Sequence, residues 1–424
     1  PFGMATIVID NGAGTVRGGF AGQALPHHSI ENCLAKHKNN PNSPTLIGES
    51  ILKSHSSHLK FKRPHDKGYL IDWEAEIEIW NVLFDSKHMK VNNYKDHKIL
   101  FTEPPFAPTV LSQTTNEVIF EEFGFNACYR CPSSALSVYQ EQVLEDEKSD
   151  EFDETLPGSD AIVVVDMGFS FSHVYCYYKG RAIQPATVRL NVGGKLMTNY
   201  LSEVLSYRQL NVLEDFQLVT KAKEALSFVS LDFDKDMIST RRKSSLDQCS
   251  SSILREYVLP DYKNIKQGYV RNSKEDDEIE KKILAKGEEL PQVLKLENER
   301  FAIPEILIHP TDIGIKQAGI PECIVQSIKK CPVFLQPILS GNVLLTGGCS
   351  KIPGMQERIQ LELRALVPSH APVNVRIPQK DPDLHAWKGG SMFAKSKDFS
   401  NFYVSKEDYE EYGHRVCDEK FIDW

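Results

Sequence analysis

Residues 7–14 read Ile-Val-Ile-Asp-Asn-Gly-Ala-Gly, and residues 161–168 read Ala-Ile-Val-Val-Val-Asp-Met-Gly. Each stretch is a short run of apolar, mostly β-branched residues that ends in Asp-x-Gly, and strand-like sequence follows at 16–20 and 172–178. This pattern predicts a β-hairpin twice, with a glycine turn at each tip. Because the same unit recurs far along the chain, we expect two similar lobes whose glycine turns face each other across a cleft.

Helices are predicted where apolar residues return at helical spacing. Such spacing covers 73–84, 196–205 and 355–366, and the last two ranges directly follow glycine turns. A short apolar strand at 342–345 precedes the third of these helices. Strand, glycine turn and helix therefore recur along the chain, which predicts an α/β fold. A chain of 424 residues is also too long for one small core, so its length favours two lobes.

The composition argues against several classes of protein. No apolar run approaches the ~18 residues that a membrane helix needs, so we expect an intracellular protein with no membrane partner. The net charge of −9 argues against a protein that coats DNA through bulk electrostatics, although basic spots at 241–243 and 329–330 leave local contact open. The nine cysteines, including a CxxC at 128–131, are expected to be reduced thiols rather than a disulfide frame or a metal site.

The two Asp-x-Gly turns carry residues that suit a phosphate ligand. Glycine turns let backbone N–H groups approach phosphate oxygens, and an Asp at a strand end can hold the waters of a bridging Mg²⁺. Asp10 and Asp166 are the candidates for that water-mediated metal contact. Arg17 either adds a cation for the phosphates or is an ordinary surface arginine. A single Asp-x-Gly is common turn chemistry, so the signal is the pair, together with a third glycine turn at 346–348.

These segments resemble actin. Residues 7–14 and 19–22 resemble actin's first phosphate loop, and 190–201 matches its glycine turn and following helix without a gap. Further similar blocks lie at 223–224, 231–233, 298–305, 345–354, 387–391 and 406–421. The resemblance therefore runs from about Thr6 to Phe421. It implies an actin-like fold, of the kind shared by actin, Hsp70 and sugar kinases, with two similar lobes around a nucleotide cleft.

The resemblance also implies a ligand, which is ATP or ADP with Mg²⁺ bound in the cleft as a structural component. The residues expected to contact it come from the glycine turns, the two hairpins and the pair at 223–224. They are Asp10, Asn11, Gly12, Ala13, Gly14, Arg17, Asp166, Gly168, His173, Gly193, Gly194, Lys223, Glu224, Gly347 and Gly348.

Departures from the actin pattern put hydrolysis in doubt. Phe169 stands where actin-like chains carry a second acid, and it is expected to crowd the terminal phosphate. Ser133 occupies the place of the glutamine that positions the attacking water, whereas His173 matches the other water-associated residue. Near the adenine, Leu384 replaces a tyrosine and Thr220 an arginine. We expect slow or absent hydrolysis and no catalytic residues, while nucleotide binding can survive.

The resemblance implies three parts of the chain. The first lobe spans 4–158, with a divergent small subdomain at 27–63 and an acidic loop at 141–157; the second spans 159–380, with a small subdomain at 195–300 and a charged insertion near 273–292; residues 381–424 return to the first lobe. Residues 27–63 do not resemble actin's filament-forming loop, and the insertions alter surfaces that actin uses for self-contact. We therefore expect a chain that does not form filaments. The insertion near 273–292 is either a charged helix or a mobile segment, and it either docks a partner or is merely solvated.

Five other segments differ from actin and resemble the actin-related protein 6 branch of the family. They lie at 119–123, 207–210, 256–262, 265–269 and 312–315. That resemblance implies a nuclear subunit of a Swr/SRCAP-type chromatin remodeller, which exchanges ordinary histone dimers for the Z-type variant. The implied partners are the remodeller ATPase, a small zinc-finger subunit of the HIT type and, through the complex, nucleosomal DNA. The implied location is the nucleus, with some protein in the cytoplasm.

Two alternative functions stay open at this point. An active ATPase or kinase of the same superfold would need a catalytic base or a group that positions water, and Ser133 and Phe169 are poor replacements. A cytoskeletal relative that polymerises or caps filaments would need actin-like sequence at 27–63, which the chain lacks.

Overall fold

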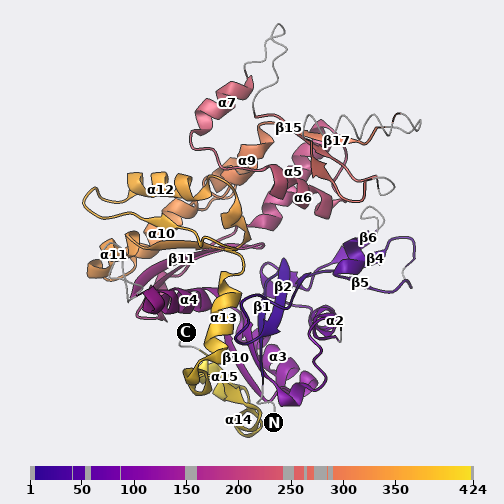
Figure 1. Ribbon diagram of the computed structural model, residues 1–424. Helices are drawn as coiled ribbons and strands as arrows, with labels where there is room; N and C mark the ends of the chain where they lie inside the picture. The colour runs from indigo at the N-terminus through magenta and orange to yellow at the C-terminus, as the bar shows by residue number, and fades with distance from the viewer. Residues whose placement is uncertain are drawn as a thin grey trace.

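The computed structural model describes residues 5–40, 42–52, 59–85, 87–148, 160–241, 253–261, 265–271, 284 and 290–421. It has two parts, each built on its own central sheet (Figure 1). The lower part in the figure contains the N-terminal strands and the last helices of the chain, and the upper part contains the middle of the sequence.

The sheet of the first lobe has the strand order β20-β10-β9-β1-β2-β3. Its strands are β1 (Thr6–Asn11), β2 (Thr15–Phe20), β3 (His28–Glu31), β9 (Lys98–Thr102), β10 (Ala127–Cys131) and β20 (Val404–Ser405). The first three strands pair antiparallel, and β9 and β10 continue parallel to β1. All six residues of β1 are buried, which is why this strand reads as a continuous apolar run rather than an alternating one.

The sheet of the second lobe has the strand order β13-β12-β11-β18-β19, with β14 also paired to β12. Its strands are β11 (Ala161–Met167), β12 (Ser172–Tyr178), β13 (Arg181–Ala182), β14 (Val188–Leu190), β18 (Val343–Thr346) and β19 (Val375–Arg376). As in the first lobe, the first two strands, β11 and β12, form an antiparallel hairpin. β18 pairs parallel with β11, and β19 pairs parallel with β18.

The two hairpins match residue by residue at their tips. Asp10 lies opposite Arg17 in the first hairpin, and Asp166 lies opposite His173 in the second. The matching strand order and the matching registers confirm the prediction of two similar α/β lobes, each carrying the same glycine turn.

Helices and small sheets complete each lobe. The helices of the first lobe are α1 (Glu49–Leu52), α2 (Trp73–Phe84), α3 (Thr109–Glu117), α4 (Ser133–Lys148), α13 (His385–Lys395), α14 (Lys406–Tyr412) and α15 (His414–Lys420). Those of the second are α5 (Gly194–Arg208), α6 (Phe216–Leu226), α7 (Phe233–Arg241), α9 (Glu299–Glu305), α10 (Ile320–Lys329), α11 (Gln336–Ser340) and α12 (Met355–Leu366). The predicted helices at 73–84, 196–205 and 355–366 therefore correspond to α2, α5 and α12.

Three small sheets lie outside the two central ones. They are β5 (Leu46–Ile47) with β4 (Leu34–His37) and β6 (Leu59–Lys62), β7 (His65–Asp66) with β8 (Tyr69–Leu70), and β16 (Tyr269–Val270) with β15 (Arg255–Val258) and β17 (Val293–Leu296). No helix in the described part of the chain is long and apolar enough to cross a membrane. The eight cysteines that the structure describes are buried free thiols.

Each lobe has its own hydrophobic core, and α13 belongs to the core of the first. The larger clusters of buried side chains follow the two central sheets. The C-terminal part of the chain leaves the second sheet after β19 and returns as α13, which packs on β1 and α4. Trp387 of α13 is fully buried, and its indole N–H donates to the Val8 carbonyl at 3.1 Å.

Two sequence-based boundaries are wrong. The segment predicted as a divergent subdomain at 27–63 begins with β3, which pairs with β2 in the central sheet. The acidic loop predicted at 141–157 is helical over its first eight residues, which belong to α4. Acidic composition suggested solvation, but Glu141 is buried between Arg376 and His385. Burial acts to raise the pKa of Glu141, yet these two partners lower it to about 2. Residues 149–157 and most of 273–292 lie outside the described residues.

Candidate functional site

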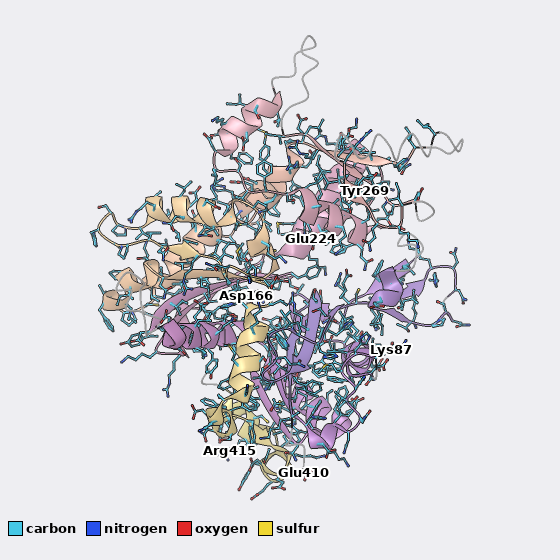
Figure 2. The ribbon with its side chains drawn as sticks, in the orientation of Figure 1. Lys87, Asp166, Glu224, Tyr269, Glu410 and Arg415 are labelled. Carbon is cyan, nitrogen blue, oxygen red and sulfur yellow. The ribbon has the colours of Figure 1, made fainter. Side chains whose placement is uncertain are left out.

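A cavity of about 660 Å³ lies where the glycine turns of the two lobes meet. All of the predicted nucleotide-contacting residues line it except Gly193. Asp166 lies near the centre of the molecule, where the two halves face each other, and Glu224 lies above it in the upper half (Figure 2). The sequence-based prediction therefore selected residues that the fold brings into one place.

Asp10 is held rigidly at the end of β1. Thr102 of β9 donates its hydroxyl to Asp10 Oδ1 at 3.0 Å, and Arg17 of β2 donates to Asp10 Oδ2 at 3.0 Å. The Thr102 hydroxyl also accepts the backbone N–H of Asn11 at 2.8 Å. Both neighbouring strands thus fix the carboxylate, and the turn that follows presents its backbone to the cavity.

Asp166 occupies the matching position in the second lobe. The Ser133 hydroxyl, at the start of α4, donates to Asp166 Oδ2 at 2.6 Å. The third glycine turn passes directly beside it, because a Cβ on Gly347 would lie 2.9 Å from Asp166 Oδ1. Burial raises the pKa of Asp166, and the charge of Asp10 acts in the same direction, whereas the bond from Ser133 opposes them. The two lobes therefore present carboxylates to one cavity.

His173 differs from its counterpart in the first hairpin. It pairs with Asp166 as Arg17 pairs with Asp10, but burial and the nearby Arg189 lower the pKa of His173 to about 3. The ring is therefore neutral at physiological pH. The second hairpin offers a hydrogen-bonding ring where the first offers a permanent cation.

Lys223 and Glu224 on α6 have different roles. The ammonium group of Lys223 is buried and donates to the Gly194 carbonyl and to the Thr198 hydroxyl, at 2.8 Å each. These bonds fix the start of α5. Glu224 has an exposed side chain at the cavity edge and forms an ion pair with Lys221 at 3.6 Å. Glu224 is therefore the member that can reach a ligand.

The remaining predicted glycines also separate by role. A Cβ on Gly348 would meet no atom within 4 Å, so this turn faces open space inside the cavity. A Cβ on Gly193 would lie 2.7 Å from the Phe169 carbonyl oxygen. Gly193 therefore lets α5 pack against the second turn and does not line the cavity.

Comparison with known proteins gives the same family over the whole chain. The family model described as Actin matches residues 3–422. "Actin-related protein 6" of Arabidopsis thaliana is 37% identical, with 98% of this chain and 99% of that protein covered. "Actin-like protein arp6" of Aspergillus fumigatus is 37% identical, with 98% and 94% covered, and "Actin-related protein 6" of Drosophila melanogaster is 33% identical, with 98% and 99% covered.

The chain belongs to the actin-related protein 6 branch of the actin family. Its cavity is therefore the cleft of an actin fold, and the departures from the actin pattern can be located in it.

Phe169 lies between the first two glycine turns of this actin-like cleft. A Cβ on Gly14 would lie 2.8 Å from Phe169 Cγ, so the ring packs directly on the first turn. The Arg63 guanidinium lies 4.7 Å from the centre of the same ring, and the Phe216 ring lies 6.1 Å from it. An aromatic side chain therefore occupies space between the turns that present backbone N–H groups to phosphates in an actin fold.

The other departures lie in different places. Ser133 and Thr220 line the cavity, whereas Leu384 does not. Asp383, the residue before it, does line the cavity. Thr102 and Lys351 line it too, and the sequence analysis predicted none of these three residues. The local sequence around Thr102 and Asp383 carries no motif, whereas Lys351 follows the third glycine turn. They enter the cavity because segments far apart in the chain pair with one another.

A buried polar cluster beneath the first turn was also missed. The carboxyl of Glu76 on α2 accepts hydrogen bonds from Trp80 at 3.1 Å and from Asn32 at 3.3 Å, and Asn32 also donates to the Gly12 carbonyl at 3.1 Å. The Trp80 indole reaches Asn11 Oδ1 at 3.2 Å as well. The sequence did contain a signal here. Glu76 lies three residues after Trp73 and four before Trp80, so this acid falls on the apolar face of a helix.

The cavity fits a nucleotide better at one end than at the other. Open space beside Gly348 and the exposed carboxylate of Glu224 suit a nucleoside. At the opposite end Phe169 fills the space between the turns, and carboxylates already engage Arg17. A Mg²⁺ ion would neutralise phosphate charge there, and Asp10 and Asp166 would hold its waters. The residues therefore fit a nucleotide with Mg²⁺, while Phe169 reduces the space left for its phosphates.

Proposed function

We propose that this chain is a structural subunit of a Swr/SRCAP-type nuclear remodeller that exchanges histones for the Z-type variant. In this role it supports complex assembly and nucleosome contact, forms no filaments and has little or no ATPase of its own. Membership of the actin-related protein 6 branch supports the proposal. The observation that carries its non-catalytic part is the orientation of Ser133, whose hydroxyl is engaged by Asp166 at 2.6 Å.

Hydrolysis in a phosphoryl-transfer site needs a group that orients the attacking water. Ser133 is short, and its donor points at a carboxylate rather than into the cavity. His173 is neutral, and Phe169 crowds the turns where the terminal phosphate would lie. Binding can persist without turnover, and ATP or ADP bound only to the folded chain would stabilise the closed lobes by mass action.

The proposed partners are the remodeller ATPase subunit and the HIT-type zinc-finger subunit, with nucleosomal DNA contacted through the complex. The proposed location is the nucleus, with some protein in the cytoplasm. Support for both comes from the branch of the family rather than from the cavity.

Two measurements test the proposal, one on the coexpressed complex and one on the isolated chain. Coexpressed with a remodeller ATPase and a HIT-type zinc-finger protein, the chain should co-purify with both. The isolated chain should release phosphate from ATP at well below the ~1 s⁻¹ of an ordinary enzyme. Steady turnover that Asp166→Asn abolishes would show that the cleft is catalytic after all, and absence of co-purification would contradict the assembly role.

A further inference from the structure

Asp383 lies where the chain crosses from the second sheet to α13. Its Oδ2 accepts a hydrogen bond from Arg17 at 2.9 Å, and its Oδ1 lies 3.2 Å from the ammonium group of Lys351. Arg17 belongs to β2 of the first lobe, and Lys351 follows the third glycine turn in the second lobe. One carboxylate therefore connects cations from both lobes.

The contact of Asp383 with Arg17 lies inside the cleft, whereas the Lys351 side chain is 53% exposed. The side chains of Arg17 and Asp383 are 15% and 20% exposed, and both line the cavity beside the glycine turns. The backbone N–H of Gly347 donates to the Pro382 carbonyl at 3.2 Å, which holds the crossing segment against the third turn. Both terminal nitrogens of Arg17 are engaged, because the second one donates to Asp10.

The carboxylate of Asp383 is ionised. Burial acts to raise the pKa of Asp383, but Arg17 and Lys351 hold it below its ordinary value. Oxygen atoms that carry negative charge and accept from an arginine and a lysine have the chemistry of a phosphate oxygen.

We propose that Asp383 is an internal anion that occupies Arg17 and Lys351 in place of a nucleotide phosphate. It joins the lobes when no ligand is present, and it selects against ligands that carry a diphosphate. Because Asp383 is part of the chain, its effective concentration at the two cations is high, and a phosphate must compete with it. This inference goes beyond the proposed assembly role, and it concerns a property of the isolated chain.

The test removes the charge of Asp383 and keeps its shape. Without ligand, Asp383→Asn should melt roughly 2–4 °C below the wild-type chain, because Arg17 and Lys351 lose the anion they share. Its affinity for MgADP and for inorganic pyrophosphate, measured by titration calorimetry, should rise about tenfold, because both cations become free for phosphate oxygens. Asp381→Asn is the matched control. Asp381 is half exposed and pairs with Lys388 at 3.5 Å, so both measurements should stay at wild-type values.

Lys351→Gln provides a second variant. In the Asp383→Asn background it should remove most of the gained pyrophosphate affinity, because Lys351 is one of the two cations that the phosphate oxygens gain. An Asp383→Asn protein with an unchanged melting temperature would overturn the proposal. So would an affinity for pyrophosphate and MgADP that stays the same or falls. Co-purification with a remodeller is measured separately, so its failure would not alter either readout.

Discussion

Glu76 places a carboxyl group among aromatic rings and amides directly beneath the first glycine turn. Its side chain is fully buried, and burial raises the pKa of Glu76 to about 7, although hydrogen bonds from Asn32 and Trp80 oppose the rise. His65, on the other side of the carboxyl at 3.9 Å, has its pKa lowered to about 4 by burial. Folding therefore shifts the two pKa values in opposite directions, upward for Glu76 and downward for His65.

Glu76→Gln should stabilise the protein in alkaline solution alone. Because the folded pKa of Glu76 lies above its unfolded value of 4.5, its contribution to stability is complete below pH 4.5 and is lost as the pH rises through about 7. An amide carries no charge, so the variant should gain about 3 kcal/mol in free energy of unfolding at about pH 8.5 and less than about 1 kcal/mol at about pH 5.

Denaturant unfolding at the two pH values measures this difference. Glu78→Gln, an exposed change on the same helix, should have no pH-dependent effect and serves as the control. His65 contributes in the opposite sense, with stability present above 6.5 and lost as the pH falls through about 4. Because His65 is present in both proteins, its contribution cancels when the variant is compared with the wild type at each pH. An equal gain at both pH values would show that folding does not raise the pKa of Glu76.

At the scale of elements, the contact of α13 with α4 joins the C-terminal part of the chain to the first lobe. The helices approach so closely at Gly389 that a Cβ there would lie 1.9 Å from the Leu136 carbonyl oxygen. Gly390 faces side chains instead, since a Cβ there would lie 3.1 Å from Leu136 Cδ1 and from Val8 Cγ1. Gly389 therefore faces backbone atoms, whereas Gly390, the next residue, faces methyl groups that can move.

Gly389→Ala should destabilise the protein by about 2–3 kcal/mol, because the two backbones must move apart despite the better helix propensity of alanine. Gly390→Ala makes the same chemical change one residue later, and its effect should stay within about 1 kcal/mol of zero, since methyl groups can shift and the propensity gain offsets the crowding. Denaturant unfolding of both variants measures the contrast. Equal effects would show that α13 adjusts its position freely on α4.

At the scale of the whole molecule, the fold leaves the charged insertion near 273–292 between two strands that pair with the same neighbour. β16 ends at Val270 and β17 begins at Val293, and both pair with β15. The Leu259 N–H donates to the Gln292 carbonyl at 2.8 Å, so the sheet extends to that residue. The insertion can therefore be shortened without removing a described strand.

Replacing residues 273–289 with a short Gly-Ser linker should weaken recovery of the remodeller partners and leave the melting temperature within about 2 °C of wild type. The reason is that, of the two alternatives for this charged, off-pattern segment, we infer that it docks a partner, whereas β15 and its two neighbours stay intact. Pull-down of the partners and thermal melting measure the two effects. Undiminished recovery would show that the segment is only a solvated insertion.

The sequence by itself determined the parts of this protein that local pattern encodes. The two hairpins, their Asp-x-Gly turns and the helices α2, α5 and α12 follow from short-range periodicity and turn chemistry, which are properties of neighbouring residues. The similarity to actin extended them to a whole fold, since it covers nearly every element.

Tertiary structure alone decided the features that depend on partners distant in the chain. Glu141 looks like part of an acidic loop until Arg376 and His385 approach it, and His28–Glu31 becomes a sheet strand only because β2 is free at that edge. Asp383 enters the cleft because the chain crosses back between the lobes, which brings it to Arg17 across more than three hundred residues of sequence. A local pattern cannot specify such contacts, because each depends on where the other segment is placed by the rest of the fold.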